Sequence, residues 1–407
     1  MTTAALARRR LLITFSIFVL LGLPEGIQGT AWPSIRTTFG QPVSNLASVI
    51  TAYTLGYLLG TVSSGRMSEV FGPERALRLG VSLTLAGLLG YLFSPAWIVF
   101  VISALILGAG AGTVDSVINA DVALRYGPRV MHLLHAFFGV GATLGPLLVT
   151  VLLQSDVSWR VAYGLLVVIE ASLLAGLVAL RAIPPAEIQH PVAADRRPSA
   201  ARPGMALAAT LAYFCIYVAT EVSIGQWSFS VLTESRSYST GAAGLAVAGY
   251  WAGLTVGRLA LGVIDRRLRP ETLLRGAVAT ALAASVWFWA ALPGSGLALA
   301  VLGIAFAGIF PSLVLLTPHW LGRDRVVRAV GYQLAASSGG AIVASFVLAE
   351  VAGDGGAVGL SALPGAFVVM VVLLGSTHVF TEWATRGADR TTTDSSRWAP
   401  SRRATMP

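Results

Sequence analysis

Long apolar stretches separated by short polar segments make up almost the whole chain. Each stretch has about 20 residues, enough for a helix to cross roughly 30 Å of hydrocarbon. The alternating segments of about ten residues that a membrane β-barrel needs do not occur. The pattern therefore predicts an all-α polytopic membrane protein with twelve transmembrane helices, at 11–33, 44–64, 75–93, 96–120, 130–153, 160–181, 205–231, 241–262, 272–291, 296–318, 327–349 and 358–382.

Composition supports this fold class and excludes several functions. Of the 407 residues, 55% are hydrophobic and only 12% are charged, and the mean hydropathy is +0.74. The net charge of +9 does not indicate nucleic-acid binding, because the arginines lie in short clusters between apolar stretches. No phosphate-binding G-x-x-x-x-G-K-[ST] motif or nucleophile–base constellation is found, so we expect no enzyme activity, no cofactor and no metal.

Arginine placement predicts the orientation of the spans. Almost all interhelical arginines fall on the side of the N-terminus, and only Arg36, Arg160 and Arg236 fall on the opposite side. Because positive residues stay inside, we expect both termini in the cytoplasm and the chain in the cell inner (plasma) membrane. The partners expected are the lipid bilayer, a small-molecule substrate and protons, with the protein a monomer.

A proline- and arginine-rich segment divides the spans six and six. The expected units are an N-terminal six-helix bundle over 1–181, a cytoplasmic linker over 182–204, a C-terminal six-helix bundle over 205–384 and a disordered cytoplasmic tail over 385–407.

The two halves repeat each other. A shift of 197 residues places eight residues of the segment 53–78 on identical residues of the second half, in the second and third spans and their connecting loop. The matched residues are Tyr53, Gly56, Gly60, Gly65, Pro73, Glu74, Leu77 and Arg78, with Tyr250, Gly253, Gly257, Gly262, Pro270, Glu271, Leu274 and Arg275. Parallel repeats related by an axis along the membrane normal place a substrate site between the halves, near the midplane.

The loop GRMSEVFGPER (65–75) resembles the loop between helices two and three of the major facilitator superfamily. Glu69 stands where that loop has its acid, and Arg75 matches a basic position. The segment 253–267 resembles the equivalent loop of the second half, with Asp265. The resemblance implies the two-bundle fold and a gating role for Glu69, Arg75 and Asp265.

The segment 108–146 resembles the fucose:proton symporter family and its relatives more narrowly. The matching pattern is an acid with an asparagine four residues later, followed by a short basic loop and a Phe-Gly-x-Gly-Ala run. The sequence GIFPS at 308–312 is also similar to that family. The resemblance implies that Asp115 carries a proton and that the substrate is a sugar or another polar solute. Asn119 lies one helical turn after Asp115, on the same face.

Two further acids occupy matching places in the repeat. Glu25 in GLPEGIQGTAW and Glu221 share a Glu-x-x-x-Gly element with a nearby tryptophan, and each lies roughly 22–24 Å along its helix. An ionisable residue in a span costs at least about 2.5 kcal/mol, so it normally faces a cavity or a partner. We expect both acids to face each other and to hold a proton or a polar substrate; protonated, purely structural acids are the alternative. Glu170, in a peripheral span, is expected to make a structural hydrogen bond.

Helical spacing assigns roles to two basic side chains. His135 and Asn119 are each eight residues from the turn near residue 127, so a His135–Asn119 contact that relays protons to Asp115 is possible. A packing histidine is the equal alternative. Arg258, seven residues before Asp265, is expected to snorkel toward the cytoplasmic surface or to pair with the acids of that loop, in a gating rather than a substrate role.

Amides and tryptophans on the first and seventh spans provide a candidate substrate surface. Aromatic faces and amide groups suit a sugar or another polar ring. The residues concerned are Gln28, Trp32, Gln226 and Trp227, and Asn119 of the fourth span is a further candidate substrate-binding residue. For Trp32 the alternative is a place in the interfacial aromatic belt, because Pro33 is expected to end its span.

The sequence thus predicts a proton-coupled secondary transporter of a small polar solute that works by alternating access. Gly141-x-x-x-Gly145-Pro146 resembles the antiporter signature of the superfamily and keeps open proton-driven efflux of a drug or metabolite. Small residues at these positions also permit close helix packing. A non-transporting receptor on the same fold is the third alternative, and sodium remains an alternative to protons.

Overall fold

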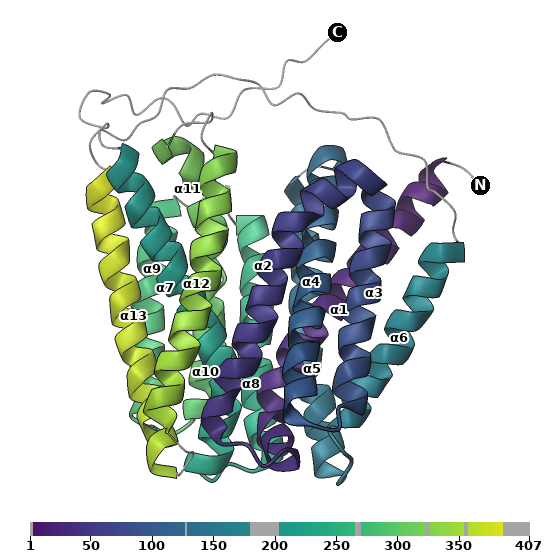
Figure 1. Cartoon of the computed structure of the whole chain (residues 1–407). Helices are drawn as coiled ribbons and strands as arrows, with labels where there is room; N and C mark the ends of the chain where they lie inside the picture. Colours follow the sequence, from purple (N-terminus) through teal and green to yellow (C-terminus); the bar gives the residue numbers. More distant parts are fainter. Residues whose placement is uncertain are drawn as a thin grey trace, which may run out of the picture.

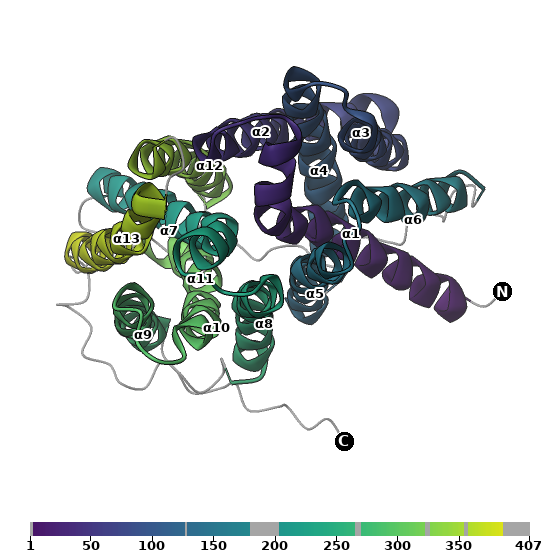
Figure 2. The same ribbon diagram turned by 90° about the horizontal axis from the view of Figure 1, so that it is seen from below.

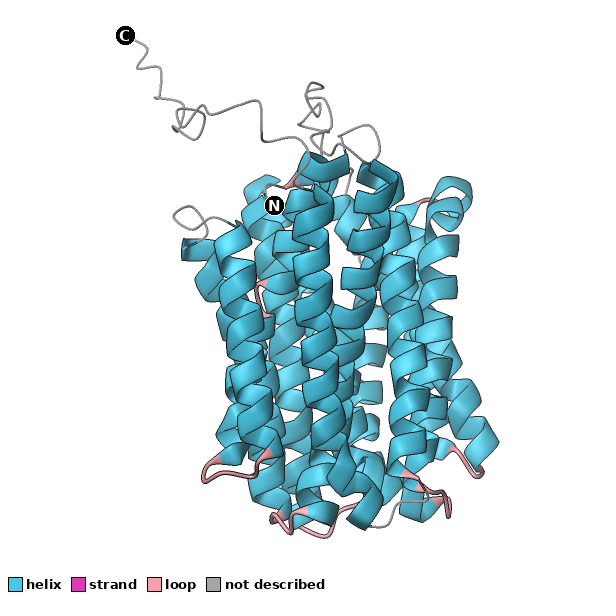
Figure 3. Ribbon diagram, turned by 90° about the vertical axis from the view of Figure 1, so that its left-hand side faces the viewer, coloured by secondary structure: helices cyan, strands magenta, loops and turns pink. Residues whose placement is uncertain are grey.

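Thirteen α-helices and two short helical turns make up the described part of the chain in this computed structural model, which describes residues 3–126, 128–179, 203–264, 270–321, 326–353 and 357–385. None of these residues forms a strand (Figure 3). The elements are α1 (Thr3–Thr38), η1 (Val43–Asn45), α2 (Leu46–Phe71), α3 (Pro73–Phe93), α4 (Trp97–Arg125), α5 (Pro128–Gln154), α6 (Arg160–Ala179), α7 (Pro203–Ser230), η2 (Val231–Ser235), α8 (Thr240–Ile264), α9 (Pro270–Trp289), α10 (Ser295–Phe306), α11 (Ile309–Leu321), α12 (Val326–Ala352) and α13 (Ala357–Thr385).

Twelve helical segments of the described chain are long and apolar enough to cross a membrane, which confirms the predicted fold class. The tenth span consists of two helices, α10 and α11, which are interrupted at Ala307–Gly308. The expected linker and tail lie outside the described residues, except for residues 203, 204 and 385. Helix α1 begins and α13 ends on the same face of the molecule, here called the upper face (Figure 1).

The first span is longer than the sequence pattern predicts. Helix α1 continues through Pro24 and Pro33 to Thr38, so the expectation that Pro33 ends this span is wrong. Proline is tolerated inside membrane helices because neighbouring helices and hydroxyl side chains satisfy the freed backbone groups. The continuation past Pro33 brings Arg36 to the lower face of the molecule.

Helix packing in the first half recurs in the second half. Helix α2 packs on α4 as α8 packs on α10, α1 on α5 as α7 on α12, and α3 on α6 as α9 on α13. Figure 2 shows α1–α6 and α7–α13 as two groups side by side. The glycines matched by the repeat mediate these contacts: Gly56 and Gly60 lie against the α4 backbone, and Gly253 lies against the α10 backbone.

The two groups of helices meet mainly along three pairs, α5 with α8, α2 with α12, and α1 with α7. Among these, the α1–α7 pair carries the acids singled out by the repeat. Helix α1 is held in place by α5 through glycines on both sides. Gly141 and Gly145 of α5 lie against the α1 backbone, and Gly22 and Gly26 of α1 lie against the α5 backbone. The glycines of the antiporter-like motif therefore serve close packing of α1 on α5.

Candidate functional site

A cluster of charged side chains lies where α1, α7 and α8 meet. Arg258 Nη2 of α8 lies 3.2 Å from Glu221 Oε1 of α7, and the two side chains are 20% and 12% exposed. Glu25 of α1 interacts electrostatically with both Glu221 and Arg258. The two repeat-related glutamates are thus close enough to interact across the contact between the halves, and Arg258 of the second half joins them.

Arg258 bonds Glu221, a partner that the sequence did not predict. The sequence spacing suggested the acids of the following loop, but the guanidinium lies within α7–α8 and bonds Glu221. Asp265, the nearest of those acids, lies outside the described residues. A buried arginine needs a partner at its own depth in the membrane, and Glu221 is the acid that α7 presents there.

Two tyrosines complete this cluster, and the sequence analysis missed both as site residues. Tyr250 donates a hydrogen bond to the Glu221 carbonyl oxygen at 2.8 Å. Tyr217 donates to the Phe306 carbonyl oxygen at 3.2 Å and interacts electrostatically with Glu221 and Arg258. Both tyrosines are buried. They satisfy polar groups that are costly to bury without partners.

The glycines of the repeated Glu-x-x-x-Gly element allow close contacts around these acids. Gly29 lies against Gln226, whose Nε2 donates to the Glu25 carbonyl oxygen at 3.0 Å. A Cβ on Gly225 would lie 2.6 Å from the Trp251 ring. A larger residue at Gly29 would push α1 and α7 apart, and a larger residue at Gly225 would push α7 and α8 apart. The glycines of this element therefore allow the close helix packing that holds the acids near the interface.

Asp115 forms a second polar centre within the first half. Tyr57 of α2 donates to Asp115 Oδ2 at 2.7 Å, and Asn119 Nδ2 donates to Asp115 Oδ1 at 2.9 Å. Asn119 also donates to the Asp115 carbonyl oxygen one turn earlier in α4. The predicted proximity of Asp115 and Asn119 is present, and Tyr57 is an additional partner. Asn119 serves here to orient Asp115.

Tyr53 is within electrostatic range of both centres. It interacts electrostatically with Glu25 of α1 and with Asp115 of α4. Tyr53 and Tyr250 are matched by the repeat, and each lies close to the glutamate of its own half. This match was the signal in the sequence that could have identified both tyrosines as site residues.

His135 lies on α5, where its ring contacts Phe18 edge-on at a centroid distance of 5.9 Å. The amide of Asn119, its predicted partner, donates to Asp115. The proton relay through His135 stays a prediction.

The candidate substrate residues have different surroundings. Trp32 is fully buried, donates from Nε1 to the Val43 carbonyl oxygen at 3.1 Å and packs on Trp97, so it anchors the end of α1 within the first half. Gln28 of α1 and Gln226 and Trp227 of α7 are buried, and Gln226 contacts α1. Gln226 Oε1 and the indole nitrogens of Trp227 and Trp251 make no hydrogen bond within the described residues. Such polar atoms are candidates for contacts that form in another conformation or with a substrate.

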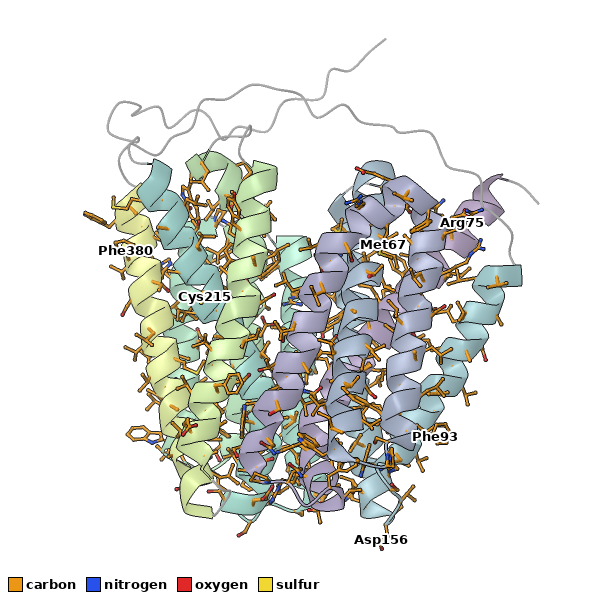
Figure 4. All side chains as sticks on the ribbon, viewed as in Figure 1. Met67, Arg75, Phe93, Asp156, Cys215 and Phe380 are labelled. Atoms are coloured by element: carbon orange, nitrogen blue, oxygen red, sulfur yellow. The ribbon has the colours of Figure 1, made fainter. Side chains whose placement is uncertain are left out.

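The expected gating residues of the first half lie at the upper face. Glu69 is exposed near the end of α2, and Arg75 is exposed at the start of α3, where Figure 4 labels it. Their gating role stays a prediction.

At the lower face, an ion pair joins the two halves. Arg36, near the end of α1, bonds Glu234 of η2. Each side chain is about one-fifth exposed. Together with the Gln226–Glu25 contact, this pair closes the α1–α7 interface on the lower side of the charged cluster. The sequence analysis did not single out Arg36 or Glu234 as site residues, although both lie at the ends of the matching helices of the two repeats.

The site therefore combines three acids with one arginine. Arg258 can neutralise one carboxylate, which leaves Glu25 and Asp115 able to bind a proton or another cation. Among the described residues, no group of three or more His, Cys, Asp or Glu side chains is arranged to hold a metal ion.

Comparison with known proteins gives one family and several distant relatives. The family model described as Major Facilitator Superfamily matches residues 14–345. The glucose/mannose transporter GlcP of Bacillus subtilis is 22% identical over 359 residues, which are 83% of this chain and 86% of that protein. Bypass of stop codon protein 6 of Saccharomyces cerevisiae is 24% identical over 292 residues, 65% of this chain and 59% of that protein.

Solved structures share the fold at low sequence identity. A D-xylose-proton symporter superposes with a TM-score of 0.69 and 16% identity, covering 91% of this chain and 96% of that chain. The fucose:proton symporter of E. coli gives a TM-score of 0.60 at 14% identity and covers 93% and 98% of the two chains. These likenesses concern the arrangement of the helices.

Proposed function

The chain belongs to the major facilitator superfamily, and on this premise we propose that it is a proton-coupled transporter of a small polar solute of the sugar class. It is a multi-pass membrane protein. The observation that carries the proposal is the cluster of Glu25, Glu221 and Arg258 at the contact between the halves, together with the second polar centre at Asp115. A proton on the uncompensated acids would lower the cost of burying them when the site is closed on both sides.

Sugar transport is supported by the polar surface and by the named relatives. Gln28, Gln226 and the indole nitrogens of Trp227 and Trp251 offer neutral donors and acceptors on α1, α7 and α8, the helices that carry Glu25, Glu221 and Arg258. Hydroxyl groups of a sugar match such donors and acceptors. The similar proteins include a glucose/mannose transporter and a D-xylose-proton symporter.

The two-group architecture supports a mechanism of alternating access. The arginine distribution favours a cytoplasmic upper face, with both termini inside the cell. The Arg36–Glu234 pair and the Gln226–Glu25 contact would then close the external side. Opening that side requires α1 to separate from α7, which exposes Gln226 and the acids to the outside.

Flux measurements on the purified protein in liposomes test the function. With glucose, mannose, xylose and fucose as labelled solutes, we expect uptake when the outside is more acidic, with no requirement for sodium. Loss of a solute from the vesicles under the same gradient would instead support the proton-driven efflux alternative. If none of these solutes, and no member of a wider panel of polar compounds and drugs, moves in either direction, the transport proposal is wrong.

Breaking the external ion pair is expected to favour the outward-open conformation. A partly exposed pair is worth at most about 1 kcal/mol, so Arg36→Gln should raise the outward-open population by up to about fivefold. The measurement is the rate at which a membrane-impermeant maleimide labels Gln28→Cys from outside, in a Cys215→Ser background. Arg78→Gln is the matched control, because Arg78 pairs with Glu74 within α3 and bridges no interface. Labelling rates that are equal with and without the Arg36→Gln substitution would show that this pair is not a gate.

A further inference from the structure

A small cavity lies inside the first half, apart from the contact between the halves. Its volume is about 10 Å³, at the lower limit for one water molecule. Residues of α1, α2, α3, α4 and α6 line it, and its polar lining consists of Tyr53, Thr84 and Glu170. The other lining residues are apolar: Ile17, Leu20, Leu21, Pro24, Val81, Leu107, Ala111, Val114 and Leu173.

Glu170 is buried at this cavity, with 6% of its surface exposed. The Thr84 hydroxyl of α3 donates a hydrogen bond to Glu170 Oε1, which is the structural bond that the sequence predicted. The lining contains no cation, and Tyr53 is its one other titratable residue. Glu221, by contrast, has Arg258, and Asp115 has two donors.

This environment favours the uncharged acid. Burying a carboxylate without a cation costs several kcal/mol, and the single hydroxyl donor from Thr84 recovers only part of that cost. A neutral carboxylic acid accepts the Thr84 bond and keeps its own O–H for a water molecule in the cavity. A sodium ion would need several oxygen ligands around it, which a cavity of this size and lining does not provide.

The cavity also reaches toward the central acids. Tyr53 lines it and interacts with Glu25 and Asp115. Pro24, the residue before Glu25, lines it as well. Groups that a proton could use therefore form a series from α6 to the centre: Glu170, one water molecule, Tyr53, and then Glu25 or Asp115.

We propose that Glu170 is a further proton-binding residue, which holds a proton in the apolar cavity and exchanges it with the central acids through Tyr53. In this step Glu170 gives its proton to the water, the water gives one to the Tyr53 oxygen, and Tyr53 passes its own to a central carboxylate. Glu170 becomes charged and the central acid becomes neutral, so charge balances. The exchange of protons with the central acids rests on the proposed proton coupling. The protonation of Glu170 itself does not depend on that proposal.

Infrared difference spectroscopy tests this assignment in the full-length protein in lipid nanodiscs at neutral pH. We expect the carbonyl stretching band of a protonated carboxylic acid in the wild type and its loss in Glu170→Gln, which conserves size and the acceptor for Thr84. Thr84→Val is the second variant: it removes the donor and should shift the band without removing it. Tyr53→Phe should keep the band and slow its hydrogen–deuterium exchange.

Three results would overturn the proposal. Identical spectra for wild type and Glu170→Gln would show that no proton resides on Glu170. Loss of the band when sodium chloride replaces choline chloride would assign the site to sodium. Exchange in Tyr53→Phe as fast as in the wild type would exclude the route through Tyr53. Because the measurement needs neither substrate nor flux, its failure is distinguishable from failure of the transport proposal.

Discussion

Asp115→Asn is expected to abolish accumulation driven by a pH gradient while solute exchange continues. Asparagine keeps the size of the side chain and an oxygen that can accept from Tyr57 or Asn119, but it cannot take up a proton. One pH unit corresponds to about 1.4 kcal/mol per proton, or about tenfold in a concentration ratio. At a gradient of one unit, the wild type should therefore approach about tenfold accumulation per coupled proton, and the variant a ratio of about one.

The measurement is uptake of the transported solute into liposomes with and without a pH gradient, together with counterflow at equal pH. Asp121→Asn is the matched control, because Asp121 lies on the same helix but pairs with Arg10 at 2.6 Å, away from the α1–α7 contact. This variant should keep both accumulation and counterflow. Full accumulation of the solute by Asp115→Asn would show that Asp115 does not couple proton movement to transport. Glu25 would then be the next acid to test.

The number and placement of the spans could be predicted because the bilayer imposes its own length scale. About 20 apolar residues are needed to cross it as a helix, and every backbone polar group must be satisfied within the segment. The ends and interruptions of helices were less predictable. Helix α1 passes through Pro33, and the tenth span is interrupted at Ala307–Gly308. Both features depend on contacts with neighbouring helices, which the apolar pattern does not encode.

The candidate site was predictable to the extent that the repeat identified it. Matching positions for Glu25 and Glu221 correctly placed two acids near each other. The partners of these acids depend on how each helix is rotated against the next, and a single sequence does not define that rotation. For this reason Arg258 was assigned to a loop rather than to Glu221, and the role of Tyr57 was missed. The buried Trp32 similarly has its hydrogen-bond partner on η1, outside its own helix.

Arg258→Gln is expected to be among the most destabilising polar substitutions in the protein. Unlike the Arg36–Glu234 pair, which lies at the lower ends of its two spans, Glu221 lies near the middle of its membrane-spanning segment, where removing Arg258 leaves the carboxylate without compensation at a cost of about 3–5 kcal/mol. Glu221 would then lie beside Glu25 with no cation between them, which adds repulsion between two carboxylates. The free energy of unfolding, measured by titration with sodium dodecyl sulfate in mixed micelles, should fall by about 3 kcal/mol or more.

The double variant Arg258→Gln/Glu221→Gln separates loss of the charge pair from loss of packing. If the cost of Arg258→Gln comes from the unpaired carboxylate, neutralising Glu221 should recover most of it, because a neutral pair of similar volume is often as stable as a buried ion pair. The exposed pair Arg78–Glu74, 3.5 Å apart within α3, is the control, and its disruption should cost no more than about 0.5 kcal/mol. A double variant no more stable than Arg258→Gln alone would mean that the arginine stabilises the fold through Tyr217 and helix packing, and that Glu221 is protonated without it. In that case the site would hold three acids that can each bind a proton, and the arginine would no longer define which of them couples to transport.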